Sequence, residues 1–220
     1  MVRSTFDARV VPPPVVALVR ELQLRAPCHL AGGAALSGVH LAHRLSADID
    51  LFCHEREHVR DLVRDLPYVA SRCNADIRIV RDAGSFVRAT VRVGGNPLEL
   101  DLVHEALPDL EPPPPLIEGV LVESFADLRA SKLTCLLSRS EPRDLVDLLF
   151  LDGAGYAPER DLPMALRKDA GIDPGVFAWL LRDFPVSPLP QMLEPLTEAQ
   201  LARFRDALAE RFRQVAVPTL

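Results

Sequence analysis

The spacing of hydrophobic residues predicts helices alternating with a strand in the first third of the chain. After the prolines at 12–14, VVALVRELQL has apolar residues at the spacing of one helical face. A short Ala/Leu-rich segment at 34–41 comes after two glycines, and the segment at 55–66 again has helical spacing. Between them, DIDLF at 48–52 alternates polar and apolar residues, which predicts a strand.

After Asn74, apolar residues recur at every second position. DIRIV at 76–80, FVRATVRV at 86–93 and PLELDLV at 97–103 each alternate polar and apolar residues, as half-buried strands do. The sequence VGGN at 93–96 is a hairpin signal between the last two. We therefore predict antiparallel strands that extend the sheet begun at DIDLF.

The proline-rich stretch PDLEPPPP at 108–115 continues neither a helix nor a strand, and the pattern of the remaining residues predicts helices. A chain in which the strands of the sheet come first and most helices follow has an α+β arrangement. We predict a mixed or antiparallel sheet flanked by helices, in a core domain at 1–115, and a helical C-terminal domain at 116–220. Trp179 and the phenylalanines of the last helices are expected in the core.

Composition narrows the class of protein. With 48% hydrophobic and 25% charged residues, and no apolar run near the roughly 20 residues that span a bilayer, the sequence predicts a soluble, cytoplasmic protein without a membrane partner. The first residues lack the apolar stretch of a signal peptide. Four scattered cysteines contain no CxxC pair, so we expect free thiols.

The formal net charge of -6 argues against a protein that holds nucleic acid by a general basic surface. A local basic surface is still open, because eight arginines gather within one stretch. This stretch is either a solvated face or a binding surface. The arginines are Arg56, Arg60, Arg64, Arg72, Arg78, Arg81, Arg88 and Arg92.

Asp48 and Asp50 are the first candidate site residues. On a strand they lie on the same face, about 6.8 Å apart at about 3.4 Å per residue. Two carboxylates so close repel each other unless a cation lies between them. Hard oxygen ligands suit Mg²⁺ (or Mn²⁺), which commonly completes its shell with substrate phosphates, so the pair predicts a nucleotide site.

Asp101 and the two glycines complete the pattern. Asp101 alternates with Leu100 and Leu102, so it lies on the polar face of its strand, either as a third metal ligand or simply as an exposed residue. Gly32 and Gly33 lack Cβ atoms, which lets the backbone N–H groups at a helix start approach a triphosphate.

These motifs, taken together, resemble the AbiEii/AbiGii toxin family of the nucleotidyltransferase superfamily, which includes DNA polymerase β. The resemblance covers about residues 28–152. The segments that carry it, in order, are GGAAL at 32–36, HRLSADIDLF at 43–52, SKLTCLLSR at 131–139 and RDLVDLLFL at 143–151. Members are the toxin half of type IV toxin–antitoxin and abortive-infection systems.

The resemblance implies roles for individual residues. Asp101 would be the base for an attacking hydroxyl, and Lys132 would neutralise triphosphate charge. The same resemblance places Arg44 and Ser46 in the nucleotide pocket, and Arg139 at the phosphates. Asp147 and Arg143 match a late RDxxDL motif. From the residues alone, Lys132 on a helix is more commonly a surface lysine, and Arg143, Asp144 and Asp147 are alternatively a surface ion-pair set.

The function that the resemblance implies is Mg²⁺-dependent transfer of NMP from an NTP to an acceptor hydroxyl, with the tRNA 3′ end as acceptor and a cognate antitoxin as partner. Other interpretations stay open. The acceptor is alternatively a protein hydroxyl or a small molecule such as an antibiotic. A protein that has lost catalytic activity would instead be a nucleotide-binding or partner-binding module.

Overall fold

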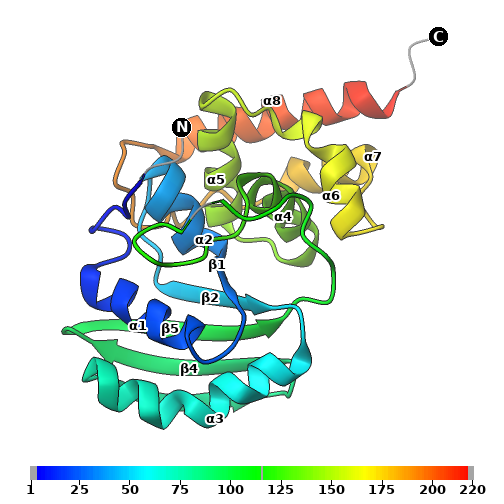
Figure 1. The fold of residues 1–220 in the computed structure, drawn as a ribbon. Helices are drawn as coiled ribbons and strands as arrows, with labels where there is room; N and C mark the ends of the chain where they lie inside the picture. The colour runs from blue at the N-terminus through cyan, green and yellow to red at the C-terminus, as the bar shows by residue number, and fades with distance from the viewer. Residues whose placement is uncertain (1–3, 115, 218–220) are drawn as a thin grey trace. The chain divides into compact units, whose positions relative to one another are not determined.

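The computed structural model describes residues 4–114 and 116–217. They form two compact units, the first ending at Ser124 and the second beginning at Phe125, and each is described by itself (Figure 1). The first unit holds a mixed five-stranded sheet with helices, and the second is helical, so the α+β prediction is confirmed. The predicted domain limits, 1–115 and 116–220, stay a prediction.

The sheet of the first unit has the strand order β1-β2-β5-β4-β3. Its β2 and β5 strands are parallel, and every other neighbouring pair is antiparallel. The strands are β1 (His29–Ala31), β2 (Asp48–Cys53), β3 (Asp76–Asp82), β4 (Phe86–Val93) and β5 (Asn96–His104). The predicted antiparallel order holds from β3 to β5, but β5 joins β2 in parallel.

Strand β1 was not predicted from the sequence. Its three residues are all buried, so they lack the alternation that reveals a half-exposed strand. It pairs with β2 through His29 and Phe52, Leu30 and Leu51, and Ala31 and Asp50.

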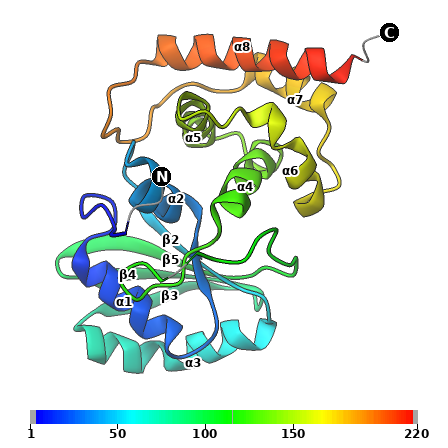
Figure 2. The ribbon, with the colours of Figure 1, turned by 45° about the horizontal axis from the view of Figure 1, so that its top comes forward.

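One face of the sheet is covered by helices α1 (Pro13–Gln23) and α3 (Arg56–Cys73), which also contact each other (Figures 1 and 2). The apolar residues of the strands point to these helices. Ile49, Leu51, Leu100 and Leu102 are at most 3% exposed. The alternating positions, which include the aspartates, therefore lie on the opposite face.

The first unit also contains α2 (Gly32–Ala35), which continues as a π-helix from Leu36 to Leu41. The predicted helix at 34–41 is thus present. It ends at Ala42, whose φ of 51° is left-handed and turns the chain back toward β2. Helix α3 runs past its predicted end at Leu66 and stops at Asn74, also left-handed with φ 49°.

The second unit is built from helices. They are α4 (Phe125–Ser138), α5 (Pro142–Gly153), α6 (Leu162–Lys168), α7 (Pro174–Leu180) and α8 (Glu198–Ala216), with 3₁₀ turns at Pro158–Arg160 and Leu181–Asp183. Thr197 and Gln200 form a capping box at the start of α8.

The prediction that Trp179 is a core residue is wrong, because its side chain is 69% exposed. Phe177, Phe184 and Phe212 are buried as expected, whereas Phe204 on α8 is only half-buried. Helix α7 is only seven residues long, so it has one narrow inward stripe, which Phe177 occupies against Phe212 at 5.0 Å between ring centroids.

All four cysteines are free thiols, as predicted; Cys28 and Cys53 are buried, and Cys73 and Cys135 are half-buried. Burial raises the pKa of the Cys135 thiol. Within residues 4–114 and 116–217, no helix has the length and apolar character needed to cross a bilayer.

Candidate active site

The parallel pairing of β2 with β5 brings the three predicted carboxylates together on the polar face of the sheet. Asp50 lies directly opposite Asp101 in the register, and Asp48 lies opposite Glu99. Neighbouring strands are about 4.8 Å apart, and Asp48 is two residues from Asp50 on the same strand face. Asp101, which is far from Asp48 and Asp50 in the sequence, therefore joins them in one cluster.

Arg88 on β4 binds the carboxylate of Asp101 through two parallel hydrogen bonds. Its Nε donates to Oδ1 at 2.8 Å and its Nη2 donates to Oδ2 at 2.7 Å. Its Nη1 also lies 3.2 Å from Oε2 of Glu99. The hydrogen bonds to Asp101 raise the pKa of Arg88, so this guanidinium stays charged. Asp101, only 5% exposed, is held in one orientation.

Gly32 allows Asp50 to approach the backbone at the start of α2. A Cβ atom at Gly32 would lie 1.9 Å from Oδ2 of Asp50, inside the carboxylate itself. The φ angle of Gly32 is +66°, a left-handed conformation that glycine adopts without steric cost. The glycine is thus required by its backbone conformation and by the close carboxylate.

Gly33 makes the same kind of room for Arg44 and Ser46. A Cβ atom at Gly33 would lie 2.7 Å from Nη2 of Arg44 and 2.9 Å from Oγ of Ser46. Arg44 is buried, and its Nη1 donates to the carbonyl of Leu45 at 2.9 Å. Ser37 fixes this turn, since its hydroxyl donates to the carbonyl of Arg44 at 2.6 Å.

An open hollow of about 760 Å³ lies on the same unit beside Asp48 and Glu99. Its far side is formed by β3 and β4, which contribute Arg78 and Arg92, both exposed. Part of the arginine cluster seen in the sequence therefore lines a hollow that reaches the acidic residues, although Arg88 binds Asp101 instead.

The donor set fits a divalent cation with a preference for hard oxygen ligands. Asp48, Asp50 and Asp101 offer carboxylate oxygens on one strand face, and a carboxylate has about four lone-pair sites, of which Arg88 uses two on Asp101. Mg²⁺ is commonly held by one or two carboxylates together with water and phosphate oxygens. These residues would hold such an ion.

Lys132 and Asp147, predicted from the late motifs, meet inside the second unit. Lys132 on α4 is 3% exposed, and its Nζ lies 2.8 Å from Oδ2 of Asp147 on α5. Asp144 is a second partner of Lys132 at 3.7 Å. Both carboxylates are fully buried, so the alternatives of a surface lysine and a surface ion-pair set are wrong.

Arg139 joins this buried cluster through Asp144. Its Nε and Nη2 donate to the two carboxylate oxygens at 2.9 and 3.0 Å. Burial is the largest single effect and lowers the pKa of Arg139, but the hydrogen bonds to Asp144 and the attraction of nearby negative charges together raise the pKa of the guanidinium. Arg143 pairs with Glu141 at 2.5 Å.

The predicted residues thus form two groups, one in each unit. Gly32, Gly33, Arg44, Ser46, Asp48, Asp50 and Asp101 belong to the first unit, and Lys132, Arg139 and Asp147 belong to the second. Sequence reasoning missed two members, Arg88 and Asp144. Arg88 was detectable, because a hairpin at 93–96 places it opposite Asp101 in an antiparallel pair.

Comparisons with known proteins agree with this geometry. JHP933 from Helicobacter pylori superposes with a TM-score of 0.62 at 21% identity, covering 94% of this chain and 91% of that one. MenT4, a nucleotidyltransferase toxin from Mycobacterium tuberculosis H37Rv, gives a TM-score of 0.52 at 16% identity, covering 94% and 88%. At these identities the likeness concerns the fold alone. A search of curated proteins found no match.

The family model described as nucleotidyl transferase AbiEii toxin, type IV TA system, matches residues 16–218, which include both groups of site residues. The match confirms the resemblance drawn from the motifs at 32–52 and 131–151. The chain therefore belongs to the AbiEii family of nucleotidyltransferase toxins and is a nucleotidyltransferase.

Proposed function

We propose that this enzyme transfers NMP from an NTP to an acceptor hydroxyl in a Mg²⁺-dependent reaction, with the 3′ end of tRNA as acceptor. The observation that carries the proposal is the pairing of Asp50 with Asp101 across two parallel strands, with Asp48 on the same face. Transfer of a nucleotidyl group depends mainly on positioning and charge neutralisation, and this cluster is suited to both.

Asp48, Asp50 and Asp101 are the proposed metal ligands, and Asp101 is also the proposed base. When bound, Mg²⁺ would neutralise charge on the phosphates. The acceptor oxygen attacks the α-phosphorus, the hydroxyl proton passes to Asp101, and the bond between the α-phosphorus and the bridging oxygen breaks to release pyrophosphate. Arg88 holds the carboxylate of Asp101 in place for this transfer.

The nucleotide-binding part of the proposal rests on the turn at Gly32 and Gly33. Arg44 and Ser46 lie against Gly33, so a cationic and a hydroxyl group flank the backbone next to Asp50. We assign them to the triphosphate pocket. Lys132 and Arg139 belong to the same proposal as phosphate-binding side chains, with Asp147 holding Lys132 in position.

The choice of an RNA acceptor is supported by the hollow beside Asp48. Arg78 and Arg92 are exposed on its far side, where they would contact backbone phosphates despite the net charge of -6. A cognate antitoxin, the usual partner in a type IV toxin–antitoxin system, is part of the same proposal.

The direct test is label transfer from α-³²P-labelled NTPs in the presence of Mg²⁺. We expect Asp48→Asn and Asp50→Asn to lose transfer by at least about a hundredfold, since each removes a charge from the metal-binding cluster. Asp61→Asn is the matched control, because Asp61 is a partly exposed carboxylate of the same unit, on α3. Full activity in either site variant would refute the metal assignment.

The acceptor is identified by treating the labelled products separately with RNase and with protease. Label removed only by RNase supports the RNA acceptor. Label removed only by protease would instead indicate NMPylation of a protein partner, and label on a small molecule would indicate the antibiotic-modifying alternative.

Charge reversal at Arg78 and Arg92 should lower transfer to tRNA without changing the binding of NTP.

A further inference from the structure

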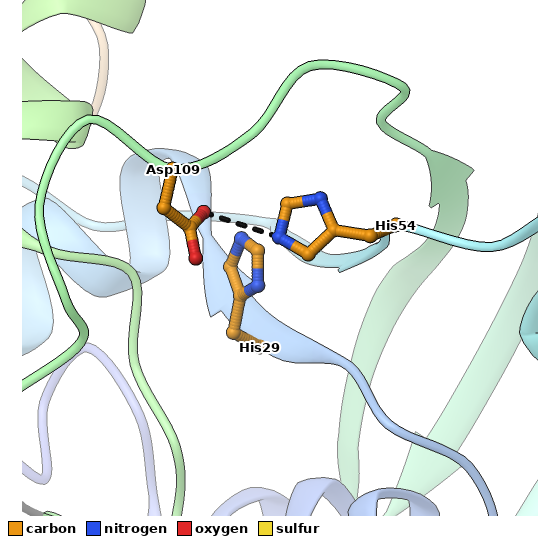
Figure 3. A group of neighbouring side chains, drawn as sticks. All are labelled: His29, His54 and Asp109. Atoms are coloured by element: carbon orange, nitrogen blue, oxygen red, sulfur yellow. Dashed lines mark ion pairs between the residues drawn. The ribbon is translucent and has the colours of Figure 1, made fainter.

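A second group of metal-binding side chains lies in the first unit, at the other end of β2 from Asp48. His29 begins β1, His54 comes directly after the last residue of β2, and Asp109 lies in the segment after β5 (Figure 3). One ligand atom from each of the three residues lies within 4.8 Å of the others. We propose that His29, His54 and Asp109 bind a transition-metal ion, of which Zn²⁺ is the best match.

The orientation of His54 is the strongest evidence. Its Nδ1 lies 3.1 Å from the carbonyl oxygen of Glu105, which can only accept a hydrogen bond, so Nδ1 carries the proton. In the neutral ring, Nε2 then presents a lone pair, and it lies 3.2 Å from Oδ1 of Asp109. A protonated ring makes this contact as an ion pair, as drawn in Figure 3, and a neutral ring presents Nε2 beside Oδ1 of Asp109 as two neighbouring ligand atoms for one metal ion.

A hydrogen bond from the second ring nitrogen to a backbone carbonyl is also the usual support of a metal-binding histidine. It fixes the tautomer and the direction of the ring, and it makes the ligating nitrogen more basic. His54 has this support from Glu105, which lies between β5 and Asp109. The carbonyl group of Glu105, which orients His54, therefore lies in the same chain segment as the ligand Asp109.

The spacing and surroundings of the group allow coordination with small movements. Tetrahedral Zn²⁺ has bonds of about 2.0–2.2 Å to nitrogen and oxygen, which places its ligand atoms about 3.3–3.5 Å apart. The side chains of His54 and Asp109 are 40% and 33% exposed and can close that difference. His29 is 6% exposed and is packed against Phe52, so it is a fixed ligand.

The open side of the site faces a hollow of about 330 Å³. The residues that line it include all three ligands, together with Glu55, His58 and Glu123. A three-residue site beside such a hollow leaves room for water, or for a further protein or ligand group, in the fourth position.

The chemistry of the ligands separates this site from the acidic cluster. Imidazole nitrogens suit Zn²⁺, Cu²⁺, Ni²⁺ and Fe²⁺, whereas Mg²⁺ is bound through oxygen atoms. His29 and Asp50 lie on adjacent strands, but His29 is in register with Phe52, two residues beyond Asp50 on β2. The two sites therefore take different ions, and occupation of one does not require the other.

Metal binding here would join three segments that are far apart in the sequence. His29 belongs to β1, His54 to the turn before α3, and Asp109 to the segment that leaves β5. Strand β5 carries Asp101, so the ion would hold the end of this strand and the segment after it against β1 and β2. We infer that bound Zn²⁺ stabilises the first unit by holding these segments together.

The test is Zn²⁺ binding by the full-length chain, after removal of bound metal with a chelator and with excess Mg²⁺ present to occupy the acidic cluster. We expect one Zn²⁺ per chain. His54→Asn and Asp109→Asn should each weaken binding about tenfold or more, since each removes a ligand. Zn²⁺ should also raise the melting temperature of the unmodified chain but not of these variants.

His104→Gln is the matched control, because His104 lies at the end of β5 on the opposite face of the sheet, in register with Cys53. It should bind Zn²⁺ like the unmodified chain. A second readout needs no variant: Zn²⁺ should shift the imidazole NMR signals of His29 and His54 but not that of His104. Unchanged Zn²⁺ affinity in both ligand variants, or unshifted His29 and His54 signals, would overturn the proposal.

Discussion

At the scale of single residues, the first unit is arranged so that charged side chains fit where other residues leave room. Asp50 occupies the space of a missing Cβ at Gly32, and Arg44 and Ser46 do so at Gly33. Arg88 orients Asp101 by two hydrogen bonds. The two glycines leave space for the side chains of proposed site residues, and Arg88 fixes the orientation of another, Asp101.

Gly32→Ala is expected to lower nucleotidyl transfer by about a hundredfold, because the new methyl group displaces the carboxylate of Asp50. The control is Gly95→Ala. Gly95 also has a positive φ, of +82°, but has no atom within 4 Å of its Cβ position. Both substitutions cost about 1–2 kcal/mol of stability from backbone strain. Similar transfer rates in the two variants would contradict a role for the close contact at Asp50.

Arg88→Met is expected to destabilise the chain by about 1.5–3 kcal/mol, because Asp101 is buried and loses two charge-assisted hydrogen bonds. If Asp101 is a metal ligand, added Mg²⁺ should raise the melting temperature of this variant more than that of the unmodified chain. Arg92→Met, an exposed position on the same strand face, is the control. An equal Mg²⁺ effect in all three proteins would argue against Asp101 as a ligand.

At the scale of elements, pairs of helices and strands decide which site residues meet. Parallel pairing of β2 with β5 aligns Asp50 with Asp101, while packing of α4 against α5 buries Lys132 between Asp144 and Asp147. A buried ion pair is a costly arrangement unless it is well paired. Lys132 therefore has a structural partner in the second unit, whatever its role toward phosphate.

Lys132→Met is expected to cost about 3–5 kcal/mol of stability, because Asp147 becomes a buried carboxylate without its lysine. The double variant Lys132→Met, Asp147→Leu should recover most of this loss in denaturant unfolding, since no charge is then left uncompensated. If Lys132 also contacts the triphosphate, the stable double variant still has little transferase activity. Full activity in that variant would remove Lys132 from the proposed site.

The alternating strands and the capped helix α8 were predictable from the sequence, because β2, β4 and β5 bury one face and Thr197 has Gln200 three residues later. Strand β3 has the same alternation in sequence, but nearly all of its side chains are exposed. The face that carries Asp48, Asp50 and Asp101 could be inferred from the same alternation. Strand β1 could not, since its residues are uniformly buried. The ion pairs of Arg88 and Lys132 were also missed, because they depend on which elements pack together.

At the scale of the whole molecule, the acidic net charge affects how an anionic acceptor would bind. The chain has a formal charge of -6, yet exposed arginines line the hollow beside Asp48. Protein–phosphate contacts of this kind are weakened by salt. Acceptor binding through Arg78 and Arg92 would therefore depend on ionic strength, although the same hollow is also lined by Asp48, Asp76 and Glu99.

The pH dependence of stability offers a test at this scale. Burial lowers the pKa of His40, in the π-helix after α2, from 6.5 to about 4. The unfolded chain then binds a proton more readily than the folded chain. The stability associated with neutral His40 is complete above about pH 6.5 and is lost as the pH falls from 6.5 toward 4. His40→Gln removes this proton linkage.

Unfolding free energies measured at pH 7 and pH 5 should therefore fall by about 1–2 kcal/mol more in the unmodified chain than in His40→Gln. His104→Gln is the control, since it keeps His40 and should behave like the unmodified chain. Each protein is compared with itself at the two pH values, so a loss of packing energy in His40→Gln that does not depend on pH cancels from the result. If His40→Gln shows the same fall as the unmodified chain, His40 is already protonated at pH 5 without cost, and the assigned burial effect is wrong.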